Sequence, residues 1–395
     1  MHCAVIGAGI VGLSIGWELA RSGYRVTLID PEPATGATHA AAGMLAAVTE
    51  FHYQEQGLLG LSVPAADAWP RWARELEAAS GRPTGFEACG TLVVAADGAD
   101  RADLSALAEA QRTVGLGIGE LGTAAAREVE PLLAPRLAGA FRAPGDARTD
   151  PRRTAAALLA ALELESGVSV NRRRATGVVA GAHGPVVQTL GPDGAREDLE
   201  ADEVILATGT GRTGERGGAG ERISGLPASL RLPVRPVFGD VLRMRPTATA
   251  PRPAGSTVRA LVSGQRVYIL PRRDGEVVVG ATEREDDQPG ISVEGVHRLL
   301  RDALRVMPAL AHYELVDLTA RARPSTPDHL PLLGRIGPGL LAATGFHRHG
   351  VLLSVAAAAT IRGLIGPVPG ATPPRPPPAS LDPTRLAPFD PWRFS

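Results

Sequence analysis

The chain begins with a short apolar run, residues 2–6, followed by a glycine-rich turn and an apolar pattern that repeats every three to four residues up to Ala20. This change from a continuous run to helical spacing predicts a strand, a turn and a helix. A second apolar run, residues 24–30, follows the helix. Because a crossover helix joins the two runs, we expect the strands to lie parallel in one βαβ unit.

Segments with the same strand character return far along the chain. Residues 203–209 and 340–345 are apolar and end in Ala-Thr-Gly, so we expect both to lie in the same parallel sheet as the first unit. The region between them carries shorter apolar or alternating runs separated by turn residues, which predicts an antiparallel sheet. These runs are residues 233–246, 257–262, 266–271 and 276–282.

The other periodic segments predict helices over residues 52–82, 99–131 and 151–166, and short strands over residues 86–97, 168–171, 175–181 and 184–190. The expected fold class is α/β, with a Rossmann-type dinucleotide-binding domain and an inserted α+β substrate domain built on an antiparallel sheet. The dinucleotide domain is expected to be discontinuous, with residues 1–50, 140–225 and 322–366. The substrate domain takes residues 51–139 and 226–321, and a proline-rich C-terminal strap takes residues 367–395.

The composition narrows the classes of function. With 395 residues, 44% hydrophobic content and a formal net charge of −1, the chain can bury a large core and has no basic excess for nucleic acid. Only Cys3 and Cys89 are present, so neither a disulfide framework nor a Cys-based metal site is expected. Met1 and His2 lead directly into the first apolar run, and no long uncharged apolar run follows. We therefore expect no secretion signal, no membrane span and a cytoplasmic location.

Gly7, Gly9 and Gly12 have the spacing of a dinucleotide-binding fingerprint. The first glycine permits a tight turn, the second lets a pyrophosphate approach the backbone, and the third lets the helix pack closely on the strand. Asp30 ends the second strand, where a carboxylate can accept hydrogen bonds from a ribose hydroxyl. Ordinary turn glycines before a core helix are the alternative, but the complete strand–helix–strand context favours a dinucleotide.

Residues 38–45 place small side chains before Met44. Such a stretch would let the backbone lie flat against a large planar ligand. From these residues alone, a well-packed alanine helix is an equal alternative.

Five motifs give the chain a family resemblance. In order they are GAGIVG at 7–12, ATHAAAGML at 37–45, YILPRRDGEVVVGATERED at 268–286, ARARPSTPDHLPLLGR at 320–335 and ATGFHRHGVLLS at 343–354. They resemble the glycine oxidases of thiamine biosynthesis, which belong to the D-amino-acid-oxidase-like FAD-dependent oxidoreductases. The resemblance extends from Ala4 to about Ile365, and AAAGML together with RPSTPDHLPLLG is more specific than the glycine fingerprint.

By this resemblance the cofactor is FAD. Besides Gly7, Gly9, Gly12 and Asp30, the implied FAD contacts are Ile10, Val11, Pro31, Ala37, Thr38, Ala42, Gly43, Met44, the backbone near Thr176, Phe346, His347, Arg348, His349, Gly350, Val351 and Leu352. We expect non-covalent FAD, because relatives that link the flavin through Cys place that residue near the C-terminal part of the chain, where this sequence has none. His39 stands four residues before Gly43, whereas the linking histidine of His-linked relatives stands three before.

The same resemblance implies Arg323, Arg348 and Tyr268 as catalytic and substrate-binding residues. A guanidinium can bind a carboxylate through two parallel hydrogen bonds, which suits an amino-acid substrate. Arg323 could equally pair with a surface carboxylate, and Tyr268 could be a core tyrosine with a satisfied hydroxyl. His347 and His349 flank Arg348, but the sequence suggests no third ligand nearby, so no metal site is expected.

The sequence departs from the family pattern at several positions. Glu283 and Arg266 stand where relatives carry Met and His near the glycine site, so a charged pair is expected to line the substrate pocket as further substrate-binding residues. His349 replaces the usual Asn of the loop that follows Gly345. Phe238 stands where relatives commonly carry Lys, and all 41 basic residues of the chain are Arg. Any cation that assists the reaction with oxygen therefore has to be Arg or His.

The implied reaction is FAD-dependent oxidative deamination of a small amine or amino acid, most directly glycine, with molecular oxygen as the final acceptor and hydrogen peroxide as a product. From glycine, the imine would supply thiazole formation in thiamine synthesis. One alternative is a dehydrogenase for D-amino or N-methyl amino acids that passes electrons to another carrier. A remote alternative is a flavin-binding module without turnover. The sequence leaves a homo-oligomer open.

Overall fold

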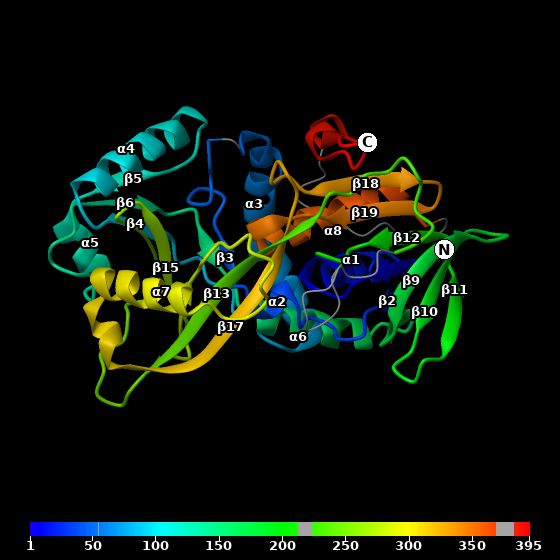
Figure 1. Cartoon of the computed structure of the whole chain (residues 1–395), viewed down its shortest axis with the longest axis horizontal. Coiled ribbons are helices and arrows are strands. Elements are labelled where there is room, and N and C mark those ends of the chain that lie inside the picture. Colours follow the sequence, from blue (N-terminus) through cyan, green and yellow to red (C-terminus); the bar gives the residue numbers. More distant parts are fainter. Residues whose placement is uncertain (54, 212–222, 369–382) are drawn as a thin grey trace.

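The computed structural model describes residues 1–53, 55–211, 223–368 and 383–395. Two large sheets occupy the two halves of the elongated molecule, with helices packed on both (Figure 1). Within the described residues, no helix is both long enough and apolar enough to cross a membrane.

The six-stranded sheet contains the N-terminal βαβ unit. Its order is β18 (Leu332–Gly337), β19 (Leu340–Thr344), β12 (Glu203–Leu206), β1 (His2–Ile6), β2 (Arg25–Ile29) and β8 (Val168–Asn171). All neighbours run parallel except β18 and β19. The strands predicted over residues 203–209 and 340–345 thus lie in the same parallel sheet as the first unit, as the sequence predicted.

Both faces of the six-stranded sheet are covered. On one side lie α1 (Ile10–Ala20), α6 (Pro151–Glu163) and α8 (Gly350–Ile365), with α3 (Leu59–Ser80) packed on α6 and α8. On the other side, Val178 and Val187 of a small sheet pack against Ala4 and Val204. That sheet consists of β9 (Arg174–Ala180), β10 (Pro185–Leu190) and β11 (Arg196–Glu200).

The eight-stranded sheet forms the other half. Its order is β17 (Tyr313–Ser325), β13 (Arg235–Pro246), β16 (Val277–Gly280), β15 (Gln265–Pro271), β14 (Thr257–Val262), β4 (Thr91–Ala95), β6 (Gly139–Ala143) and β5 (Gly119–Leu121). The sheet is antiparallel, as predicted, except that β14 and β4 run parallel, with Thr257 opposite Thr91. These strands are far apart in the sequence, so no hairpin connection sets their direction.

Three helices cover the eight-stranded sheet: α4 (Gly98–Thr113), α5 (Thr123–Val129) and α7 (Val293–Val306). The sequence predicted one helical stretch over residues 99–131, but α4 and α5 are separated there by β5. Gly115 follows α4 with a φ of +81°, a left-handed conformation that favours glycine and ends the helix.

The short elements are α2 (Ala37–Ala40), the paired strands β3 (Met44–Leu45) and β7 (Ala147–Arg148), and 3₁₀ helices over Gln56–Leu58, Pro308–His312, His347–His349 and Pro383–Phe389. Part of the predicted C-terminal strap, residues 369–382, lies outside the described residues. Its last part is not extended as expected, because Pro383–Phe389 is helical and buries Phe389 in the core beside the six-stranded sheet.

The strands β13 and β17 connect the two halves. They run side by side from the outer end of the eight-stranded sheet to the centre of the molecule (Figure 1). At its C-terminal end, β17 makes a β-bridge between Ser325 and Phe346, just before α8. Arg323 lies within β17, close to this junction. The C-terminal end of β17 therefore lies where the two halves meet.

Candidate active site

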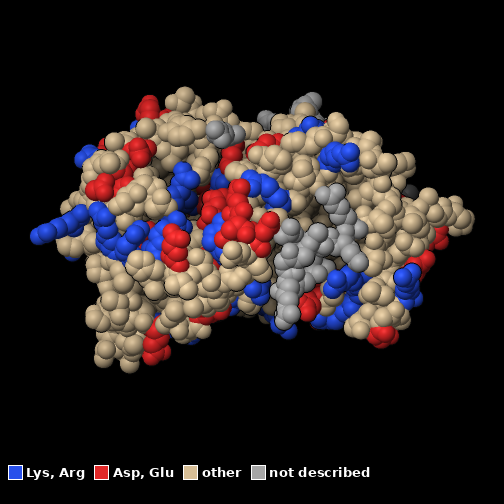
Figure 2. All heavy atoms as spheres, in the orientation of Figure 1, with Lys and Arg blue, Asp and Glu red and all other residues tan. Residues whose placement is uncertain are grey.

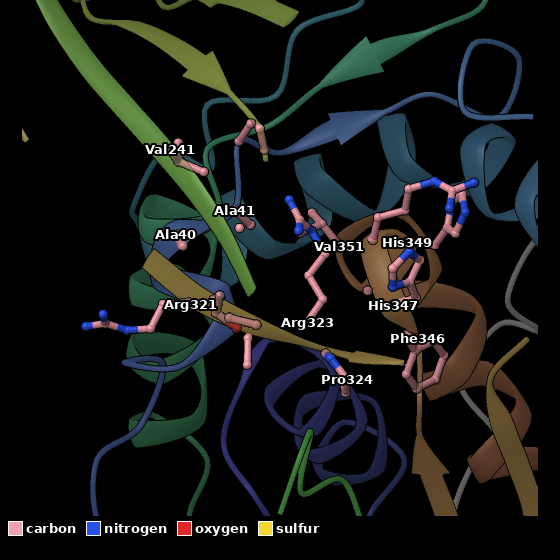
Figure 3. Close-up of a pocket in the computed structure, with 18 of the residues that line it drawn as sticks. Ala40, Ala41, Val241, Arg321, Arg323, Pro324, Phe346, His347, His349 and Val351 are labelled. Atoms are coloured by element: carbon pink, nitrogen blue, oxygen red, sulfur yellow. The ribbon is translucent and has the colours of Figure 1, made fainter. Parts of the chain in front are cut away.

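A cavity of about 1170 Å³ lies between the two halves. One wall consists of the β1–α1 turn, the end of β2 and residues 34–38 and 40–44. The opposite wall consists of side chains from β13, β15 and β17, and the 3₁₀ turn before α8 closes one end. Figure 3 shows part of this cavity, with Arg323 rising from β17 into it and Arg321 extending away from Arg323.

The glycines of the fingerprint hold the turn between β1 and α1. Gly7 has a φ of +102°, and a Cβ there would overlap the carbonyl oxygen of Ala207. A Cβ at Gly12 would overlap the carbonyl oxygen of Gly7 and lie 3.0 Å from its carbonyl carbon. Helix and strand are therefore too close for any side chain at either position. This is the close packing that the fingerprint predicts.

The N-terminus of α1 faces the cavity through Ile10 and Val11. Its N-cap, Gly9, provides no side-chain cap, and its first turn contains no acidic residue. The first N–H groups of a helix and its dipole favour an anion, so a diphosphate fits here. The carboxylate of Asp30 accepts hydrogen bonds from the backbone N–H of Ala8 at 2.7 Å and of Glu32 at 2.9 Å. These bonds fix a carboxylate at the edge of the cavity, where a ribose fits.

The small-residue stretch lines the cavity in a mostly non-helical form. Only Ala37–Ala40 is helical, so the alanine-helix alternative does not hold for the residues that follow. Gly43 has a φ of +90°, and a Cβ there would lie 2.7 Å from the ring of Pro151. Two arginines hold the backbone of this stretch: Arg152 Nε donates to the His39 carbonyl at 2.8 Å, and Arg272 Nη2 donates to the Ala42 carbonyl at 2.8 Å.

Most of the residues expected to contact FAD line this single cavity. They are Gly7, Gly9, Ile10, Val11, Asp30, Pro31, Ala37, Thr38, Ala42, Gly43, Met44, Phe346, His347, Arg348, His349, Gly350, Val351 and Leu352. Gly12 lies behind this lining, in the packing of α1. Thr176 lies outside the lining, with its hydroxyl donating to the Gln188 carbonyl, whereas Arg174, two residues earlier on β9, reaches the cavity. An FAD contact at Thr176 stays a prediction.

Arg323 enters the cavity without a carboxylate partner. Its Nη1 donates to the carbonyl of Thr282 at 3.1 Å, and within the described chain it forms no ion pair. Its guanidinium lies over Gly239, where any Cβ would overlap it. A half-buried guanidinium that is held in place but not neutralised can accept a carboxylate through two hydrogen bonds.

Tyr268 and Glu283 lie near Arg323. The hydroxyl of Tyr268 packs over Gly280 and has no hydrogen-bond partner in the described part of the chain. Burial raises the pKa of Tyr268, so its hydroxyl stays protonated and can donate. Glu283 Oε1 lies 3.1 Å from His347 Nε2, and this contact is the main cause that lowers the pKa of Glu283 to about 2. Glu283 is therefore ionised at neutral pH and forms its contact with His347 instead of Arg266.

Arg348 is already paired. Its Nε lies 2.7 Å from Glu50 Oε2, and its Nη2 contacts Glu55. Glu50 also contacts Arg259. These charges hold the pKa of Glu50 far below its usual range against the effect of burial, and lower that of Glu55 to about 2. An incoming carboxylate would have to compete with these two glutamates for Arg348, so Arg323 is the better placed of the two arginines.

The sequence-based expectations did not include Glu50, Glu55 and Arg259. These residues lie on separate segments, and only the fold brings them to Arg348. Gly239 was also missed, although its lack of a side chain makes room for Arg323. No periodicity or motif spacing in one sequence carries this information. An isolated Gly inside an alternating strand pattern is the one available signal, since it often marks a close approach.

The two histidines beside Arg348 point to different partners. The ring of His347 stacks on His329 with centroids 4.6 Å apart, whereas His349 Nε2 lies 3.4 Å from Glu55. Across the described ranges, no group of three or more His, Cys, Asp or Glu side chains could hold a metal ion. Neither His39 nor a cysteine appears among the described residues that line the cavity, and non-covalent binding of FAD stays a prediction.

Burial of His347 predicts an acid-sensitive fold. Its side chain is 0% exposed, and burial lowers its pKa from 6.5 to about 4. Between these values the unfolded chain binds a proton that the folded chain does not, so the free energy of unfolding should fall as the pH drops from about 6.5 to about 4. We expect His347→Asn to reduce this dependence by up to about 1.4 kcal/mol per pH unit. Asn tolerates the left-handed backbone at this position, where φ is +48°.

The measurement is denaturant unfolding of the FAD-loaded protein at a series of pH values between 4.5 and 7.5. His297→Gln, on the exposed face of α7, is the matched control and should keep the wild-type pH dependence. Equal slopes for wild type and His347→Asn would show that His347 is not the titrating group.

The glycine turn, the N-terminus of α1 and Asp30 form a dinucleotide cradle. A cradle of this kind in one cavity with an unneutralised arginine is typical of an oxidoreductase whose cofactor is a dinucleotide. The chain belongs to the family of FAD-dependent oxidoreductases called DAO, whose family model matches residues 2–363. The FAD and enzyme predictions made from the sequence are thereby confirmed. The glycine turn, the α1 N-terminus and Asp30 fit the diphosphate and ribose of FAD.

Known proteins resemble the chain over most of its length. It is 33% identical over 368 residues to the bifunctional protein ThiO/ThiG of Synechocystis sp., and the matched region covers 91% of this chain and 51% of that protein. It is 32% identical over 362 residues to a glycine oxidase of Geobacillus kaustophilus, with 89% of both chains covered. The crystal structure of glycine oxidase from Geobacillus kaustophilus superposes with a TM-score of 0.82 at 29% identity, covering 99% and 98% of the two chains.

The chain spans about half the length of the bifunctional relatives that it matches. Its resemblance to glycine oxidases, stated from sequence motifs, is confirmed by these relatives and by the fold.

Proposed function

We propose that this chain catalyses the FAD-dependent oxidation of a small amino acid, glycine first, at its Cα–N bond. The substrate becomes an imine, which water hydrolyses to an oxo acid and ammonia. Molecular oxygen takes up the two electrons and two protons and leaves as hydrogen peroxide. From glycine, the imine would supply the thiazole of thiamine, a role supported by the relatives named ThiO/ThiG.

The observation that carries the proposal is the position of Arg323. Its guanidinium enters the cavity from β17, is held by the Thr282 carbonyl, and lacks a carboxylate partner within the described residues. The opposite wall of the same cavity is the cradle that fits FAD. An α-carboxylate bound to Arg323 would therefore lie inside the cofactor's cavity, which is the orientation that oxidation of the neighbouring carbon requires.

FAD, when bound, supplies the two-electron oxidation. The chain's own residues bind and orient the substrate. The Tyr268 hydroxyl can donate a hydrogen bond to the same carboxylate as Arg323. The ionised carboxylate of Glu283 can accept one from the amino group, since its pKa is about 2. The cations of Arg348 and Arg259, held by Glu50, lie beside the cavity and can stabilise negative charge that develops on oxygen.

The test uses the purified holoenzyme without oxygen. We expect glycine to bleach the yellow colour, and admission of air to restore it with formation of one hydrogen peroxide per turnover. Reoxidation no faster than that of free flavin would favour a dehydrogenase that uses another carrier. Absence of bleaching by any amino acid would favour a flavin-binding module. As part of the same proposal we place the enzyme in the cytoplasm, in line with the free thiols of Cys3 and Cys89.

A further inference from the structure

The substrate side of the cavity contains more arginines than its carboxylates neutralise. Four arginines line it: Arg259, Arg266, Arg323 and Arg348. Arg259 and Arg348 are bound by Glu50, and Arg348 also by Glu55. The remaining carboxylate, Glu283, contacts His347. Within the described residues, Arg266 and Arg323 are therefore both without an ion-pair partner.

Arg266 stands in an unfavourable environment for a cation. Its pKa is lowered, first by burial and then by the nearby Arg259 and Arg348, while Glu50 and Glu283 raise it less. A cation that is repelled by its neighbours more than it is attracted gains from an added anion. Although the walls of the cavity surround the guanidinium, Arg266 keeps solvent-exposed surface and lines the cavity, so an anion can reach it.

Arg266 and Arg323 enter the cavity at the same end of one strand pair. On β15, Arg266 precedes Tyr268 by two residues, so the two side chains share a face of the sheet. Tyr268 lies opposite Gly280 of the antiparallel neighbour β16, and Arg323 donates to Thr282, two residues beyond Gly280. Arg266 and the Thr282 carbonyl that holds Arg323 thus lie on the same side of the Tyr268–Gly280 pair, and both arginines line the same cavity.

The acidic surface outside the cavity does not supply the missing anion. The loop between β16 and α7 carries three exposed acidic residues, Glu285, Asp286 and Asp287. Figure 2 shows acidic side chains gathered near the middle of the face of the molecule that it presents. Glu285 pairs with Arg235, and Asp286 lies 2.7 Å from Arg284. These pairs engage other arginines, and Arg266 stays open to the cavity.

We propose that Arg266 forms a second anion site, and that the enzyme accepts α-amino acids with a second carboxylate and favours them over their neutral amides. The inference rests on the proposed function, because Arg323 has to hold the first carboxylate. Arg266 then binds the second one, and Glu283 remains available for the amino group between them. The site extends the substrate range beyond glycine to amino dicarboxylic acids.

The first test compares acid and amide pairs on the holoenzyme. N-carboxymethylglycine is compared with its monoamide, and each enantiomer of aspartate with the matching asparagine. We expect kcat/KM for at least one acid to exceed that of its amide by roughly tenfold to a hundredfold, the usual effect of a charge-assisted bond. In Arg266→Gln the ratio should approach one, and in Arg266→Lys it should be intermediate. Arg273→Gln, whose side chain is 81% exposed just beyond β15, should keep the wild-type ratio.

The second test needs no turnover. Succinate and its monoamide are titrated into oxidised holoenzyme, and binding is followed by the change in flavin absorbance. We expect succinate to bind at least tenfold more tightly, and Arg266→Gln to remove the difference.

The outcomes separate the two proposals. Turnover of glycine with equal kcat/KM for acids and amides would overturn the second anion site and leave the proposed function intact. Tight succinate binding without bleaching by any amino acid would overturn the proposed function and support the anion site. Arg266→Gln could instead release FAD, or lower kcat/KM for the acid and its amide by the same factor. Either result would show that Arg266 supports the cavity as a whole, and the inference would be wrong.

Discussion

Arg323→Ala should lower kcat/KM for amino acids by about a hundredfold or more while FAD stays bound. Loss of a charge-assisted hydrogen bond to a substrate carboxylate costs about 1.5–3 kcal/mol, and loss of alignment adds to the effect on the rate. Arg323 contributes little to the fold, since within the described residues its side chain makes one hydrogen bond, to the Thr282 carbonyl, and no ion pair. The measurements are steady-state kinetics with glycine and the ratio of flavin to protein after gel filtration.

Matched variants separate charge from geometry. Arg323→Lys keeps the charge but loses the two-pronged donor, so an intermediate effect is expected. Gly239→Ala leaves Arg323 intact but fills the space under its guanidinium, so it should also lower kcat/KM. Arg245→Ala removes an exposed arginine of the neighbouring strand β13 and should leave turnover unchanged. Wild-type kinetics in Arg323→Ala would move the carboxylate anchor to Arg348 or Arg266.

The parts of the fold that the sequence predicted are those in which local pattern and long-range pairing agree. The first thirty residues form a βαβ unit whose turn, helix and strand all follow from neighbouring residues. No bounds were predicted for the strand of Tyr313–Ser325, because charged residues interrupt its alternation. Its place beside β13 comes from a long pairing that begins with Arg235 opposite Ser325. A single sequence does not show such a partner.

The site divides in the same way. The cradle around Gly7 and Asp30 depends on motif spacing and could be predicted, whereas the roles suggested for Arg323 and Tyr268 came from resemblance. The charge balance could not be predicted, because it depends on which carboxylates the fold brings to which arginines. Both Arg348 and Arg266 were expected at the substrate pocket, but among the described residues only Arg348 has bound glutamates. Specificity therefore has to be argued from the assembled cavity.

Gly12→Ala should produce a protein that folds less stably and binds FAD at least tenfold more weakly. Gly12 has an ordinary helical backbone, so the change introduces no backbone strain and tests packing alone. The added methyl group would overlap the Gly7 carbonyl and lie 3.3 Å from the Ala207 side chain, so α1 has to move away from β1. Overpacking of this kind costs about 1–3 kcal/mol, and the displaced helix no longer presents its N-terminus to the diphosphate.

Gly363→Ala is the matched control, because it makes the same chemical change in another helix. Gly363 lies on the exposed side of α8, and a Cβ there meets no atom within 4 Å. Replacing a helical glycine in open space should stabilise the fold by up to about 1 kcal/mol and leave FAD binding unchanged. The measurements are denaturant unfolding and titration of the apoprotein with FAD by fluorescence. Wild-type FAD affinity in Gly12→Ala would show that the cofactor does not depend on the close contact between α1 and β1, and would contradict the placement of its diphosphate at that helix.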